Sequence, residues 1–258
     1  MTHPAMPIRT LPVFKAFRHM LNGVAAHWRP AFRIAAPWLF LITVFTIWNV
    51  KSHPFEANSP FSTTVSWSDG LTIVINLVAL SSFAVSWHKF ILRDEPLEKV
   101  IPFRVDRWVL NYIGRNLLIY LVCLVPFVVL ISGLVIAADL LKPLLIALLI
   151  QLAIFGYRMS LSLPASAIGD TTTGLKRSLE ITKGNNLRIL GLLALTYLVL
   201  AVALLALFIV ATLFEALQPN LAIISTFVLG IPVIFIQMIL TSTMFTSLYG
   251  FFVEQRDF

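Results

Sequence analysis

Residues 189–214, ILGLLALTYLVLAVALLALFIVATLF, contain no Asp, Glu, Lys or Arg. An α-helix rises 1.5 Å per residue, so about 20 apolar residues cross the hydrocarbon core of a bilayer, which is about 30 Å thick. This run is therefore long enough to span a membrane as a helix. Five further charge-free runs, the shorter of which we expect to extend into flanking polar residues, occur at 34–50, 70–87, 116–138, 143–157 and 216–253. In the last run we expect the helix to begin near Leu221, after the turn at 218–220.

The whole chain has the composition of a membrane protein. Of its 258 residues, 59% are hydrophobic and 12% are charged, whereas soluble domains average about 45–50% apolar and about 25% charged residues. An ordinary soluble domain with a water-facing surface is therefore excluded. We expect an all-α fold: a polytopic integral membrane helix bundle with six transmembrane helices joined by short loops.

The basic residues predict the orientation of this bundle. With six spans, both chain ends lie on the same side of the membrane. That side carries five Lys and Arg before residue 34, six in 89–115, five in 158–188 and one in the tail, which is 17 of the 19 in the chain. Cytoplasmic loops carry such an excess of cations. We therefore expect both termini in the cytoplasm, and this bias accounts for the net charge of +7 without a nucleic-acid partner.

The N-terminal segment precedes the first span. In residues 11–28, Phe14, Phe17, Leu21 and Val24 recur at helical spacing between cations, which predicts a basic amphipathic helix in the membrane interface. A disordered basic leader is the alternative, because three prolines come before or at its start. We divide the chain into a cytoplasmic leader at 1–30, a membrane domain at 31–253 and a cytoplasmic tail at 254–258.

The loop between the fourth and fifth runs predicts a second short interfacial helix, at 170–184. Asp170 or a following threonine is a suitable N-cap, and Gly184 is a suitable left-handed C-cap. The cations of this region are predicted to bind anionic lipid headgroups or the acidic surface of a partner, unless they serve only to set the topology. They are Arg158, Lys176, Arg177, Lys183 and Arg188.

Three stretches of this cytoplasmic side resemble a bacterial family. They are Trp87-His88-Lys89-Phe90, residues 158–165 (RMSLSLPA), and residues 175–185 with Ser178, Thr182, Gly184 and Asn185 in place. The pattern is similar to that of the YciC-like six-span inner-membrane proteins and of the membrane domain attached to some glycerophosphodiester phosphodiesterases. Leu179 stands where we expect an aromatic residue. The resemblance implies a six-span fold in the bacterial inner membrane rather than a particular activity.

The sequence carries no recognised catalytic or metal-binding pattern. Walker, GxGxxG, HExxH and GxSxG motifs are missing, and the five histidines lack the spacing of metal ligands. Intramembrane acids, which proton-coupled carriers commonly use, do not occur in the charge-free runs. Cys123 lies in an apolar run, where a thiol packs as a small hydrophobic residue. We expect no catalytic residues, no metal and no cofactor.

Three functions remain open at this stage. The leading hypothesis is a non-enzymatic inner-membrane protein that scaffolds or modulates a membrane partner or the lipid environment. The second is a small transporter or lipid-translocating protein, in which Asn76, Gln151 and Gln237 would join in a polar cavity. Hydrogen bonds between helices are the explanation that we favour for these three residues. The third is a lipid-modifying enzyme that uses inner-interface residues such as His88, Arg158 and Asp170.

The predicted topology is testable by labelling from one side of the membrane. Single cysteines at Ser59 and Ser178, in a chain whose Cys123 is replaced, are expected to react from opposite sides, because the loops that carry them differ in charge. Membrane-impermeant maleimide on intact cells should label position 59 alone. Labelling of position 178 under the same conditions would contradict the orientation.

Overall fold

The computed structural model describes residues 9–52, 67–96, 103–217 and 221–258, and within 49–52, 215–217 and 221–229 it describes the backbone alone. Every regular secondary-structure element among the described residues is a helix. Six helices are long and apolar enough to cross a membrane, as the sequence predicts. The predicted turn at 218–220 lies outside the described residues. The long helices are α1 (Val13–Ser52), α2 (Trp67–Arg93), α3 (Arg107–Ile136), α4 (Lys142–Met159), α7 (Asn186–Leu217) and α8 (Leu221–Phe252).

Short helices connect the long ones. A 3₁₀ turn, η2 (Asp139–Leu141), joins α3 to α4, while α5 (Ser162–Ile168) and α6 (Leu175–Ile181) lie between α4 and α7. Pro164 lies in the first turn of α5, where its missing N–H costs little. The helix predicted at 170–184 is α6, which is shorter than expected. Gly174 rather than Asp170 occupies its N-cap position.

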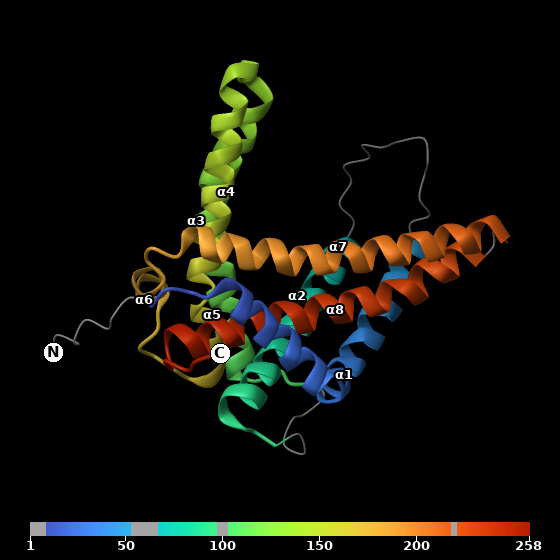
Figure 1. Ribbon diagram of the computed structural model, residues 1–258. Coiled ribbons are helices and arrows are strands. Elements are labelled where there is room, and N and C mark those ends of the chain that lie inside the picture. Colours follow the sequence, from blue (N-terminus) through green and yellow to red (C-terminus); the bar gives the residue numbers. More distant parts are fainter. Residues whose placement is uncertain (1–8, 53–66, 97–102, 218–220) are drawn as a thin grey trace.

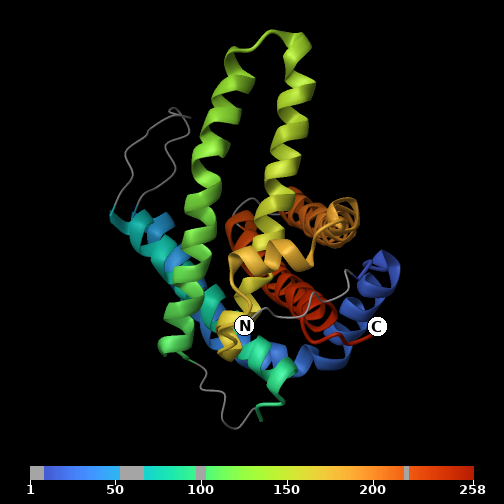
Figure 2. The same cartoon turned by 90° about the vertical axis from the view of Figure 1, so that its left-hand side faces the viewer.

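The long helices form two groups that diverge from one end of the molecule (Figure 1). α8 packs against α1, α2 and α7. The α3–α4 hairpin stands away from these helices and joins them near its base (Figure 2). Only 6% of the most apolar stretch of α3 and of α4 is buried, against 44% in α2 and 50% in α8. The outer length of the hairpin is therefore left uncovered by the other described helices.

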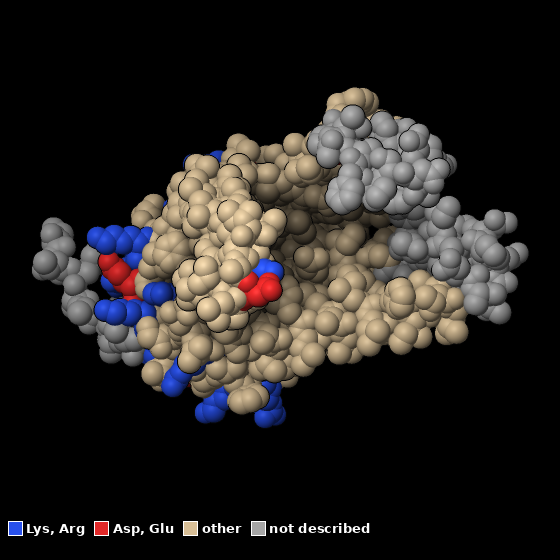
Figure 3. All heavy atoms as spheres, turned by 90° about the horizontal axis from the view of Figure 1, so that it is seen from above, with Lys and Arg blue, Asp and Glu red and all other residues tan. Residues whose placement is uncertain are grey.

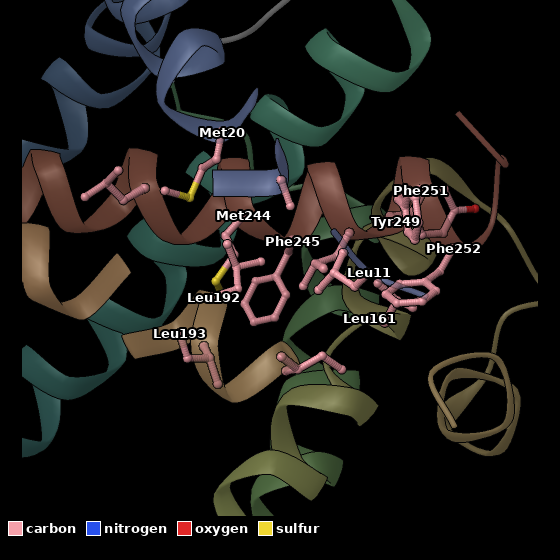
Figure 4. Close-up of a cluster of buried hydrophobic side chains, with 14 of the residues drawn as sticks. Leu11, Met20, Leu161, Leu192, Leu193, Met244, Phe245, Tyr249, Phe251 and Phe252 are labelled. Carbon is pink, nitrogen blue, oxygen red and sulfur yellow. The ribbon is translucent and has the colours of Figure 1, made fainter. Parts of the chain in front are cut away.

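The two groups meet around one hydrophobic cluster. It takes Met20 from α1, Leu161 from the start of α5, Leu192 from α7 and Phe245 from α8, all of them buried. Figure 4 shows how these side chains converge around the C-terminal half of α8, which we call its inner half. This cluster fixes the N-terminal part of α1 and the α4–α5 corner against the same helix.

The predicted amphipathic helix and the first span form one interrupted helix, α1. The backbone leaves helical geometry at His27 (φ −120°, ψ 20°). Pro30 explains the kink, because a proline removes the hydrogen bond to residue 26 and its ring crowds that carbonyl. Three residues of the predicted stripe pack against the central cluster, and Phe14 alone of the four stays exposed. Phe17, Leu21 and Val24 are thus partly covered by protein, and the interfacial position of the helix stays a prediction.

The charged side chains gather at the end of the molecule where α5 and α6 lie (Figure 3). Arg9 forms an ion pair with Asp257 there, so the two ends of the described chain are neighbours. Lys142 lies instead at the hairpin turn, paired with Asp139 at 2.6 Å. Of the two predicted labelling positions, Ser59 lies outside the described residues. Ser178 is fully buried, so the exposed Lys176 is the better site for an inner cysteine.

Gly169 ends α5 in the left-handed conformation, with φ of +80°. A Cβ added there would lie 2.7 Å from the ring of Trp108 on α3, a distance at which one of the two must move. Gly184, the predicted C-cap before α7, has nearly the same φ, +78°, but no heavy atom lies within 4 Å of its added Cβ. Both glycines adopt the left-handed backbone conformation, but only at Gly169 does a neighbouring side chain, Trp108, lie too close for an added Cβ.

Alanine at these two positions separates backbone strain from packing. Gly184→Ala is expected to lower the free energy of unfolding by about 1–2 kcal/mol, the cost of a side chain in the left-handed region. Gly169→Ala should cost a further 1–3 kcal/mol, roughly, because the added methyl group overpacks the Trp108 contact. Thermal unfolding in detergent measures both. Equal losses in the two variants would show that the α3–α5 contact adds nothing.

Candidate functional site

Arg158, in the last turn of α4, connects three helices through its guanidinium group. Its Nε donates a hydrogen bond to Thr182 Oγ1 at 2.8 Å, and its Nη1 donates to Asn186 Oδ1 at 3.1 Å. Its Nη2 donates to the backbone carbonyl of Leu179. The side chain therefore ties the end of α4 to the end of α6 and to the first residue of α7.

The charge of this guanidinium has no acidic partner. All three acceptors are neutral, and among the described residues no carboxylate forms an ion pair with Arg158. The side chain is partly buried beside apolar residues. A cation in such surroundings is costly when no opposite charge compensates it. An anion is therefore the chemical group that this position lacks.

Arg158 closes one end of a groove of about 510 Å³ between α3, α4 and α7. The groove has the size of many small-molecule sites. Its polar groups come from Gln151, Arg158 and Asn186, and its remaining wall is apolar. The apolar residues that line it are Pro126, Val129, Leu130, Leu148, Leu152, Ile154 and Phe155.

The three residues predicted to form a polar interior do not come together. Gln151 lines this groove, whereas Gln237 is exposed on α8. Asn76 donates to the carbonyl of Thr72 within its own helix, at 2.8 Å. Of the three, Gln151 alone lines this groove, so the groove is not the joined polar cavity of the transporter alternative.

The five predicted binding cations also separate into different roles. Lys176 and Lys183 are exposed, while Arg177 lies 3.7 Å from Glu180 on the same short helix. Arg188 reaches the carbonyl of Leu11 at 3.4 Å. Arg158 alone lines the groove. The predicted set is therefore one groove residue with four cations around it, rather than a single patch.

Asp170 was predicted as a helix cap and instead joins two helices. Its carboxylate accepts hydrogen bonds from Tyr249 at the end of α8, at 2.7 Å, and from the backbone and side chain of Thr172. Partial burial alone would raise the pKa of this carboxyl. The hydrogen bonds from Thr172, Thr173 and Tyr249 outweigh that effect and lower the pKa from 3.8 to about 2.

The enzyme hypothesis needs an accessible His88, and the structure encloses this side chain in protein. It is fully buried, and its Nδ1 lies 2.8 Å from Thr246 Oγ1 on α8. The Thr246 hydroxyl donates its single proton to the carbonyl of Ser242. The imidazole must therefore donate from Nδ1, which leaves Thr246 without the base that a nucleophile needs.

Asn185, which the sequence marks only as part of the family resemblance, has a structural role. Its side chain accepts a hydrogen bond from the backbone N–H of Leu11 at 2.8 Å and donates to the carbonyl of Arg9 at 2.9 Å. It thus holds the segment before α1 against the start of α7. In the sequence, the available signal for this role is an asparagine directly after the left-handed Gly184. The partner, Leu11, is not marked in the same way, because it lies 174 residues away.

In comparisons with protein-family models, curated proteins and solved structures, nothing matches the chain. The resemblance to the YciC-like family therefore stays a prediction.

The Asp170–Tyr249 contact makes stability depend on acidity. The folded pKa lies below the unfolded value of 3.8, so the contact stabilises the fold above about pH 4 and is lost as the pH falls through about 2. Asp170→Asn is expected to cost about 1 kcal/mol at pH 6, since partial exposure screens the interaction. The cost should shrink toward pH 2.5.

Thermal unfolding of both proteins across this pH range measures the difference. Asp139→Asn at the exposed hairpin turn serves as the control and should show a smaller pH-dependent difference. A gap between wild type and Asp170→Asn that stays constant down to pH 2.5 would contradict the role of the carboxylate.

Proposed function

We propose that this protein is a non-enzymatic, multi-pass protein of the bacterial inner membrane that holds an anionic phospholipid in the groove beside Arg158 and so modulates the lipid environment. The observation that carries the proposal is a guanidinium at the end of an apolar groove that forms no ion pair with any carboxylate in the part of the chain that the structure describes. A phospholipid supplies both missing parts, a phosphate for the cation and an acyl chain for the apolar wall.

The hydrogen-bonding capacity of Arg158 supports this ligand. A guanidinium carries five N–H donors, and three of them are used by the protein. One N–H therefore remains on Nη1 and one on Nη2. Arginine is favoured for phosphate recognition because its terminal nitrogens donate together. Gln151 and Asn186 add amide groups in the same groove.

The charge distribution supports a position of this site on the inner leaflet. The groove end lies on the side that the sequence predicts to carry 17 of the 19 basic residues, and the positive-inside rule favours the cytoplasm for that side. Cytoplasmic leaflets are rich in anionic lipids, and each nearby cation adds about 1 kcal/mol of attraction. The exposed Lys176 and Lys183 increase the local concentration of such lipids around the groove.

The other two hypotheses receive less support. A transporter needs a continuous polar path, and the described Asn76, Gln151 and Gln237 lie apart. A lipid-modifying enzyme needs an accessible nucleophile and base, whereas His88 and Thr246 are buried and the Thr246 hydroxyl is committed to a backbone carbonyl. A membrane-protein partner that binds beside the exposed α3–α4 hairpin is compatible with lipid binding.

Lipid retention by purified variants tests the proposal. Arg158→Gln is expected to lower retention of phosphatidylglycerol or cardiolipin about tenfold, because a charge-assisted hydrogen bond contributes roughly 1.5–3 kcal/mol. Lys176→Gln, which removes an exposed cation outside the groove, should lower retention less than Arg158→Gln does, by at most about fivefold, because one nearby cation adds about 1 kcal/mol. Native mass spectrometry from nanodiscs of mixed lipids measures the bound lipid.

Arg158→Gln also removes the contacts to α6, so a second variant is needed. Leu152→Trp fills the groove and leaves the guanidinium in place, and it should also displace the lipid. Unchanged retention in both variants, with helical content preserved by circular dichroism, would leave Arg158 with a purely structural and topological role.

A further inference from the structure

The geometry around Arg158 points to a second property of the same site: an anionic phospholipid in the groove tightens the docking of α6 onto α4, so that α6 responds to the lipid composition of the inner leaflet. This inference rests on the proposed lipid site, and it adds a coupling that binding alone does not require.

α6 depends on tertiary contacts for its stability. It has seven residues, from Leu175 to Ile181, and isolated helices shorter than about 12 residues are marginal in water. Leu175 and Leu179 pack partly buried against the cluster formed by α2, α3 and α5. At its C-terminal end, Leu179 O and Thr182 Oγ1 are held by Arg158. Among the described residues, the hydrogen bonds that join this end of α6 to another helix all come from this one guanidinium.

The guanidinium offers different nitrogens to the helix and to a ligand. Nε and Nη2 form the edge that faces α6, and Nη1 bonds to Asn186 at the start of α7. The unused N–H groups lie on Nη1 and Nη2. A phosphate can therefore bind without displacing Leu179 or Thr182, and the two interactions do not compete for the same proton.

Both interactions require the same orientation of a flexible side chain. An arginine loses up to about 2 kcal/mol of side-chain entropy when it is ordered. If the lipid orders Arg158, the docking of α6 no longer bears that cost, and the converse holds equally. Lipid binding and α6 docking therefore reinforce each other.

The segment before α6 is anchored independently of the lipid. Asp170 is bonded to Tyr249, and Gly169 packs on Trp108. The response is thus confined to α6 and the residues that follow it, up to Gly184. Lys176 and Lys183 are exposed on this stretch, so lipid occupancy changes how firmly two cations are presented at the cytoplasmic face.

Hydrogen exchange of the full-length protein in nanodiscs tests the coupling. Nanodiscs of phosphatidylcholine alone are compared with nanodiscs that also contain phosphatidylglycerol. Backbone amides of 175–181 are expected to exchange about fivefold more slowly with the anionic lipid, at the lower end of typical coupling strengths. Peptides from the inner half of α8 should not change and serve as the internal reference.

Two variants assign the effect to Arg158. Arg158→Lys keeps the charge but has one nitrogen, so it should retain part of the lipid and lose the response of α6. Thr182→Val removes one acceptor at the end of α6 and leaves the groove lining intact, so it should weaken the response and, by the same reciprocity, lower lipid retention by no more than the fivefold coupling. Tyr249→Phe loosens the preceding loop and should keep the response.

The outcomes separate the two proposals. Lipid retained in native mass spectra, together with exchange of α6 that is unchanged or faster with phosphatidylglycerol, would overturn the coupling and leave the lipid site standing. A wild-type protein that retains no anionic lipid would overturn both.

Discussion

Hydrocarbon offers no hydrogen-bond partners, so every backbone amide and carbonyl inside a bilayer must be satisfied by the protein. The long helices meet this constraint internally along their length, but helix ends carry unpaired groups. At the end where α5 and α6 lie, side chains supply the missing partners. Asp106 accepts from the first amides of α3, Asn185 bonds to the segment before α1, and Arg158 bonds to the carbonyl of Leu179. The joint between the two groups of helices depends on these contacts.

The size of the side chains explains why the helices form two groups. The buried face of α2 is rich in alanine and serine, and the inner half of α8 carries Ser242, Thr243, Thr246 and Ser247. Small residues allow close approach of helices in a membrane. The hydroxyls of Thr243 and Thr246 bond to carbonyls of their own helix, so they add no unpaired donor. The α3–α4 hairpin instead presents large aliphatic side chains, which pack equally well against lipid.

This division creates the groove and leaves Arg158 at its end. A residue needed only to fasten α6 would not have to carry a charge, since its three protein acceptors are neutral. Under the proposed function, the charge has its role when an anion approaches from the groove. Fastening and lipid binding are then two uses of one side chain, and each uses different N–H groups.

The sequence predicted features that depend on neighbouring residues along the chain. It did not predict contacts between residues that are far apart in the sequence. The six long helices and the left-handed Gly184 were confirmed, because charge-free runs and helix stops are local properties of the chain. The grouping of the described cations at one end is likewise visible in the structure. Asp170 was misassigned as a cap because its main partner, Tyr249, is 79 residues away.

The amino-acid sequence by itself determined that the chain is a helical membrane protein with six spans and an uneven distribution of charge. Hydropathy and charge act through the solvent, so they need no knowledge of which helices are neighbours. Only the tertiary structure decided that Gln151 shares a groove with Arg158 while Asn76 and Gln237 do not, and that Arg158 bonds to residues 21, 24 and 28 positions away. Those contacts depend on the rotation and crossing of packed helices, which periodicity along one helix does not specify.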